Sequence, residues 1–118
     1  MRPTRRRQDL RGERGSVAAE LAVALPAVVV VIALGIGGLL AASTHVRLQD
    51  AAADAARLLA RGEPGERAAG VVASAVAGAR SASSHSGDLV CVTATADVPI
   101  AGIPVTLTSS SCALAGGL

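Results

Sequence analysis

The chain has 118 residues, 51% of them hydrophobic, and contains no Phe, Tyr or Trp. A chain of this length forms one small domain at most, and without aromatic rings its core must be built from Val, Leu, Ile and Ala, which bury less area per residue. The lack of aromatic side chains for stacking on bases also argues against nucleic-acid binding. The composition therefore predicts a small folded part that needs support from a disulfide, a membrane anchor or neighbouring subunits.

Positive charge is concentrated at the N-terminus. Six arginines and two acidic residues give residues 1–15 a net charge of +4, whereas residues 16–118 carry −2. This basic leader has no apolar periodicity, so we expect it to be disordered or only loosely helical. A twin-arginine export signal is a weak alternative, because polar Gln8-Asp9 follow the three arginines at 5–7 where that signal requires apolar residues.

An unbroken apolar run of 22 residues extends from Leu21 to Ala42. As a helix it measures roughly 33 Å, enough to cross the hydrocarbon core of a bilayer. We therefore predict a transmembrane helix over residues 16–42, in contact with membrane lipid. Since basic flanks stay in the cytoplasm, the N-terminus is expected inside and the C-terminal part outside. A secretory signal removed near Leu40-Ala41-Ala42-Ser43 is an alternative, but such signals have apolar stretches of only about 7–15 residues.

Several residues inside the predicted span have special backbone or packing properties. Pro26 cannot donate a hydrogen bond to the carbonyl of Ala22, so a mild kink is expected there. Small residues recur every four positions at Ala33, Gly37 and Ala41. This spacing makes a face for close packing against another helix, although glycine is also simply common in membrane helices.

A lone carboxylate, Glu20, stands at the start of the apolar run, five residues after Gly15. One interpretation needs no special function: the carboxylate reaches back to the cytoplasmic surface. However, Gly15-Ser16-Val17-Ala18-Ala19-Glu20 followed by a long apolar helix resembles the class III signal of type IV pilin-like proteins. With Pro26, the short chain and a small C-terminal part containing two cysteines, the chain is most similar to TadE-like minor pilins of the tight-adherence class.

The resemblance implies a specific processing and assembly route. A prepilin peptidase would cut between Gly15 and Ser16, and Glu20 would pair with the new amine of Ser16 as the helix packs among other pilin subunits in the assembly machinery. The protein would then be part of a surface pilus or related secretion or adhesion filament. It would be a substrate rather than an enzyme, with no cofactor, no metal and no nucleic-acid partner. The main alternative is an uncleaved single-span protein whose outer domain binds a partner in an envelope or secretion complex.

The helix is expected to continue beyond the membrane as an amphipathic segment over residues 43–61. Gly62-Glu63-Pro64-Gly65 then ends it. The predicted apolar stripe consists of Leu48, Ala52, Ala55 and Leu59.

Residues 62–118 are predicted to form a small extracytoplasmic domain, which makes the fold class α+β. We expect a second short helix over 66–80, with Val72, Val76 and Ala79 on one face, and a Ser-rich loop over 81–87. Alternating Val and Thr predict strands over 88–98 and 105–108 in a β-hairpin-like arrangement. Pro99 and Pro104 should keep the connecting segment out of a central ladder position, and the tail from 113 to 118 should fray.

Cys91 and Cys112 are the only cysteines, and both lie in the part expected outside the cytoplasm. A disulfide is the natural interpretation there. A zinc site formed with His45 and His85 is a weak alternative, because no paired ligand spacing supports it.

Ser84, His85 and Asp88 include the residue types of a hydrolase triad, but they lie within one short segment and are better explained as a solvated loop.

Overall fold

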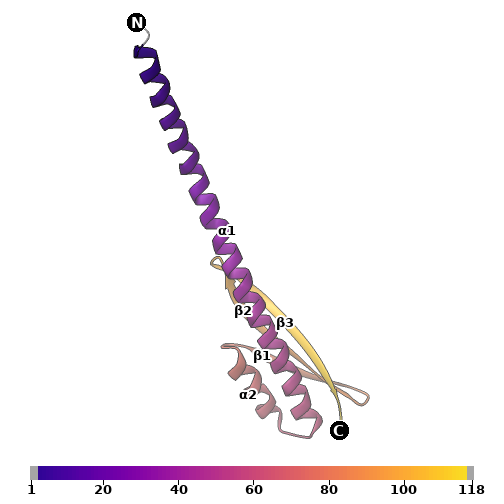
Figure 1. Cartoon of the computed structure of the whole chain (residues 1–118). Coiled ribbons are helices and arrows are strands. Elements are labelled where there is room, and N and C mark those ends of the chain that lie inside the picture. Colours follow the sequence, from indigo (N-terminus) through magenta and orange to yellow (C-terminus); the bar gives the residue numbers. More distant parts are fainter. Residues whose placement is uncertain (1–2, 117–118) are drawn as a thin grey trace. The chain divides into compact units, whose positions relative to one another are not determined.

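The computed structural model describes the backbone of residues 3–116 and the side chains of residues 14–116. The elements, in chain order, are helix α1 (Pro3–Ala60), helix α2 (Gly65–Ala75), and strands β1 (Arg80–Ser86), β2 (Leu89–Ile100) and β3 (Ile103–Leu114) (Figure 1). The α+β class, with a long first helix and a short second one, is therefore confirmed. The chain divides into two compact units, Met1–Gly35 and Ile36–Leu118. The second unit contains the C-terminal part of α1 together with α2 and the sheet.

Helix α1 begins at Pro3, within the basic leader. Proline suits the first position of a helix, where its missing N–H has no helical partner to lose, and the following Arg, Gln, Glu and Leu residues have good helix propensity. The leader backbone is therefore helical from residue 3 onward, so of the two expectations, disorder and loose helicity, the structure does not support disorder there.

Helix α1 ends through a glycine in the left-handed conformation. Gly62 has φ +83°, its N–H donates to the carbonyl of Leu59 at 3.0 Å, and the N–H of Glu63 donates to the carbonyl of Leu58 at 3.0 Å. These two bonds are those of a Schellman motif, which satisfies carbonyls left free at a helix end. The predicted stop at Gly62–Gly65 is confirmed, with the last helical residue at Ala60.

The sheet is an antiparallel meander with the strand order β1-β2-β3. Gly87, with φ +58°, is the first central residue of the two-residue turn between β1 and β2, as in a type II′ turn. Ala101 and Gly102, with φ values of +51° and +81°, form the turn between β2 and β3. Positive φ at both central positions is the type I′ pattern, whose twist matches that of paired strands.

Three local expectations about residues 62–118 are wrong. Helix α2 ends at Ala75 instead of Arg80, because Val76 is already extended and Gly78 adopts φ +76°. The Ser-rich segment is strand β1 and not a loop, since each of its residues from 80 to 86 pairs with β2. The tail is held as far as Gly116: residues 113 and 114 belong to β3, and the N–H groups of residues 115 and 116 bond to the carbonyls of Asp88 and Ala60. Residues 117 and 118 lie outside the described part.

The two prolines are direct cross-strand partners, Pro99 opposite Pro104. Strand β1 pairs with β2 only as far as Arg80 opposite Thr95, so the prolines lie in the part of the sheet that has two strands. Pro99 therefore needs no N–H bond to β1. The prediction that the prolines avoid a central ladder position is correct, although both are within strands.

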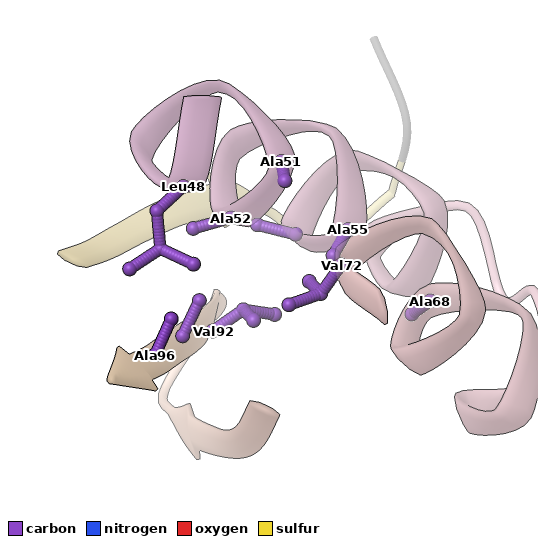
Figure 2. Packing of buried hydrophobic residues seen from close by; sticks show 10 residues of the cluster. Leu48, Ala51, Ala52, Ala55, Ala68, Val72, Val92 and Ala96 are labelled. Atoms are coloured by element: carbon purple, nitrogen blue, oxygen red, sulfur yellow. The ribbon is translucent and has the colours of Figure 1, made fainter. Parts of the chain in front are cut away.

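The core lies between the C-terminal part of α1, helix α2 and one face of β2. Figure 2 shows Leu48, Ala52 and Ala55 of α1 directed toward Val92 of β2, with Val72 of α2 beside them. The predicted stripe of α1 is confirmed, since its first three members are fully buried and Leu59 packs against the cluster. Alanines dominate this core, which allows the elements to approach closely.

Candidate functional site

The Gly15–Glu20 motif lies inside helix α1, and its residues are exposed. A Cβ added at Gly15 would meet no atom within 4 Å. Ser16 and Glu20 are four positions apart, so they share one helix face, with about 5–6 Å between their Cβ atoms. Among side chains 14–116 the ion pairs are Arg57–Asp54, Arg67–Glu63 and Arg80–Asp97, so Glu20 is unpaired within that range.

The segment that follows is apolar and uncovered by its own chain. It is long and apolar enough to cross a membrane, and almost none of it is buried by the described part of the chain. The large side chains from Leu21 to Ile36 are all more than half exposed. An exposed apolar helix of this length is compatible with a single-pass membrane protein, whose span is covered by lipid or by other helices. Pro26 lies within it, and the kink expected there stays a prediction.

The three small residues of the proposed packing face have different surroundings. Ala33 is exposed, whereas Gly37 and Ala41 are buried within the second unit. A Cβ added at Gly37 would lie 3.0 Å from Cγ2 of Ile100 and 3.4 Å from its Cα. The space beside Gly37 is therefore filled by Ile100 and Ala101 of the same chain. Packing of this face on another helix stays a prediction.

The contact between Gly37 and Ile100 was not foreseen from the sequence. The available signal was an uncharged apolar stretch, Val98 to Val105, centred on Ala101-Gly102. Such a pair between apolar residues favours a tight hairpin. No local pattern, however, indicates that the turn packs on α1.

Cys91 and Cys112 form a disulfide, which confirms the predicted pairing. They are direct partners in the β2–β3 register, with their Cα atoms 4.0 Å apart. Both lie on the sheet face opposite the buried Val90 and Val92. Because neither sulfur is a free thiolate, the zinc alternative loses two of its ligands.

The serine and histidine of the weak triad alternative are neighbours on strand β1. Ser84 pairs with Cys91 and His85 with Val90. Successive strand residues point to opposite faces, so the Ser84 hydroxyl and the His85 ring are directed apart. The arrangement is not that of a nucleophile and its base. Among the described residues there is also no group of three or more His, Cys, Asp or Glu side chains placed to hold a metal ion.

A polar contact between α1 and β3 was also missed. The buried Ser109 hydroxyl lies 3.5 Å from Nδ1 of His45, and Nε2 of Gln49 donates to the carbonyl of Ser110 at 3.2 Å. These bonds connect one turn of the helix to adjacent residues of the strand. They help to set how β3 lies along α1.

Comparison with known proteins supports the resemblance found in the sequence. The model of the family described as TadE-like protein matches residues 15–57. The match begins at Gly15 and includes Glu20, Pro26 and the first three residues of the apolar stripe of α1, but not the sheet or its disulfide. No curated protein and no solved structure matches the chain significantly. Over residues 15–57, the chain is thus similar to the TadE-like family.

Proposed function

We propose that this protein is a minor pilin or pseudopilin that takes part in assembling a Tad-class type IV pilus or a related secretion filament. The observation that carries the proposal is the Gly15–Glu20 motif at the start of an exposed apolar helix, in a segment that matches the TadE-like family. The family suggests an association with the Tad pilus and with other pilus components. Processing and the assembly role are the further steps proposed here.

The first step is insertion and cleavage. The arginine-rich leader keeps the N-terminus in the cytoplasm, and a prepilin peptidase cuts between Gly15 and Ser16. That peptide bond lies inside α1, so the helix must unwind locally before the bond reaches a protease site. Gly15 lowers the cost of unwinding by about 1 kcal/mol relative to alanine, and it offers a backbone without a Cβ at the cut.

The second step is entry into the filament. Cleavage creates an ammonium group on Ser16, one helical turn from Glu20 and on the same face. In lipid or between helices, an unpaired charge costs several kcal/mol, so pairing of Glu20 with this amine, in the same or a neighbouring subunit, favours one packing register. The lack of a partner for Glu20 among the described side chains supports this role.

The remainder of the chain supports a structural function. The span presents exposed Val, Leu and Ile side chains that other pilin helices can cover, and the second unit is a small domain stabilised by a disulfide. Under this proposal the protein is a substrate of the peptidase and a subunit of the assembly, and it catalyses no reaction itself.

The experiment that tests the proposal is the intact mass of the protein extracted from membranes. A chain that begins at Ser16 is the expected result. A chain that begins at Met1 would identify the uncleaved single-span protein that binds a partner in an envelope or secretion complex. A chain that begins beyond Ala42 would identify an exported protein whose apolar run is a removed signal.

A glycine substitution tests whether the cut depends on the motif. Gly15→Ala should slow or abolish processing, because a methyl group is added beside the scissile bond. Gly35→Ala is the matched control, since both glycines lie in α1 with open space around the added Cβ, but position 35 is far from the cut. Normal processing of Gly15→Ala, at the rate seen for Gly35→Ala, would contradict the proposal.

A further inference from the structure

The tip of the β2–β3 hairpin is an apolar surface in an otherwise Ser- and Thr-rich sheet. Every residue from Val98 to Val105 is apolar or glycine, and none is charged. Ile103 is 66% exposed although it lies opposite Ile100, which contacts α1. Covering a large apolar side chain in this position with lipid or protein lowers the free energy.

The contact with Gly37 determines where along α1 this tip lies. The methyl group Cγ2 of Ile100 occupies the space that a side chain at position 37 would fill, and the backbone N of Ala101 is 3.5 Å from that position. Both partners belong to the same compact unit, Ile36–Leu118. The tip is thus held beside a residue that belongs to the uncharged run between Glu20 and Arg47.

The length of the span gives the depth of that residue. About 20 helical residues cross the hydrocarbon core, so a span that starts at Leu21 reaches the outer boundary near Leu40. Gly37 then lies roughly 5 Å inside the boundary, at 1.5 Å per residue. A span that starts at Val17 ends near Ile36 instead and brings Gly37 to the boundary itself. In both cases the hairpin tip lies at the edge of the hydrocarbon.

Polar groups of the hairpin begin where the lipid headgroups would be. Thr106 donates to Oδ1 of Asp97 at 2.8 Å, and the guanidinium of Arg80 lies 3.9 Å from Oδ2 of the same carboxylate. Asp97 and Thr106 are three residues from the turn-flanking pair, or about 10 Å along the strands. This separation exceeds the roughly 5–7 Å of one headgroup layer, so the charges stay in or above that layer while the tip enters it.

The prolines reduce the cost of placing this backbone in lipid. In a two-residue hairpin the flanking pair, Ile100 and Ile103, exchanges hydrogen bonds, and the next pair does not. The N–H groups of that next pair would point outward from the two edges and would be unsatisfied in hydrocarbon. It consists of Pro99 and Pro104, which have no N–H.

We propose that the β2–β3 hairpin tip is a second membrane contact, inserted into the lipid of the outer leaflet beside α1. Phospholipid surrounds the tip, with acyl chains around Ile100 and Ile103 and headgroups around Arg80. The inference rests on the membrane span of the proposed function but not on cleavage or filament assembly. It also implies that the tip leaves the lipid when a subunit is extracted into a filament.

The lack of native aromatic residues allows a direct test with a single tryptophan. Three full-length variants are reconstituted in phosphatidylcholine–phosphatidylglycerol vesicles with or without brominated acyl chains. Ile103→Trp probes the tip, Val31→Trp probes the span, and Leu114→Trp probes the far end of β3; the native side chains are 66%, 68% and 68% exposed. Bromine on the acyl chains quenches the fluorescence of an indole only if the indole is in contact with those chains.

The tip and span indoles should both lose most of their emission in brominated lipid and show blue-shifted spectra, while the indole at position 114 should keep its emission. Quenching at 31 but not at 103 overturns the inference and leaves the span intact. A blue shift at 103 without quenching, growing with protein density, would assign the tip to a second subunit and also overturn it. Loss of quenching at 31 removes the span, and with it both proposals.

Glycine variants test whether the contact with α1 sets the depth of the tip. Adding Gly37→Leu to Ile103→Trp should displace the tip and reduce its quenching. Gly38→Leu is the control, because its added Cβ meets nothing within 4 Å. Equal quenching in the two double variants would show that Gly37 does not position the tip.

Discussion

Replacing Cys91 and Cys112 together by serine removes the disulfide while leaving the core intact. Both cysteines lie on the sheet face opposite the core, Cys91 half-buried and Cys112 exposed. Serine hydroxyls at these positions can be solvated, so neither a cavity nor an unsatisfied buried group is created. The loss of stability should therefore come almost entirely from the greater freedom of the unfolded chain.

The sequence separation of 21 residues sets the size of that loss. In the chain-entropy model, a loop of this length contributes about 3 kcal/mol at 25 °C. Since about 1.4 kcal/mol corresponds to a factor of ten, the opening equilibrium of β2 and β3 should rise by roughly two orders of magnitude. For a domain whose stability is of order 5–15 kcal/mol, this is a large fraction.

Hydrogen exchange followed by mass spectrometry on the reconstituted protein measures this change without unfolding the membrane helix. Peptides from β2 and β3 should exchange roughly a hundredfold faster in the Cys91→Ser, Cys112→Ser variant. The control is Thr93→Ala with Ser110→Ala, the adjacent pair on the same face, whose hydroxyls lie 3.4 Å apart. Loss of that exposed bond should cost less than about 1 kcal/mol. Equal acceleration in the two variants would refute the entropic reasoning.

Two further predictions concern Glu20 and the end of α1. Glu20→Ala should leave insertion and cleavage unchanged but lower the ratio of filament-associated to membrane-retained protein. Glu20→Asp should give a ratio between those of the native protein and Glu20→Ala. The control is Glu66→Ala, which removes an exposed carboxylate from the second unit. An unchanged ratio in Glu20→Ala would support a carboxylate that only reaches the membrane surface. Gly62→Ala should destabilise the second unit by about 1–2 kcal/mol, because φ +83° is unfavourable for a residue with a Cβ. Gly70→Ala is the comparison: Gly70 lies in open space within α2, so alanine there should stabilise the second unit by about 0.5–1 kcal/mol. Thermal melts in which Gly62→Ala and Gly70→Ala shift the melting temperature in the same direction would contradict the role of Gly62 at the end of α1.

The features that could be predicted are those encoded in neighbouring residues. The apolar run, the stripe of Leu48, Ala52 and Ala55, and the glycine at the end of α1 act through helical periodicity and local backbone preference. The disulfide was predictable because the chain has only two cysteines. The Gly15–Glu20 motif was recognisable because its residues are consecutive, so their spacing does not depend on the fold.

The sequence by itself thus determined the apolar and amphipathic parts of α1, its end at Gly62, and the motif that precedes the span. Only the tertiary structure decided that the Ser-rich segment from 80 to 86 is a strand, because its ladder with β2 outweighs a weak local preference. It also decided that Ile100 covers Gly37, two residues 63 positions apart. That contact depends on the twist of the hairpin and on how β3 lies along α1, through bonds such as Ser109 to His45. These are long-range relations, and no local periodicity records them.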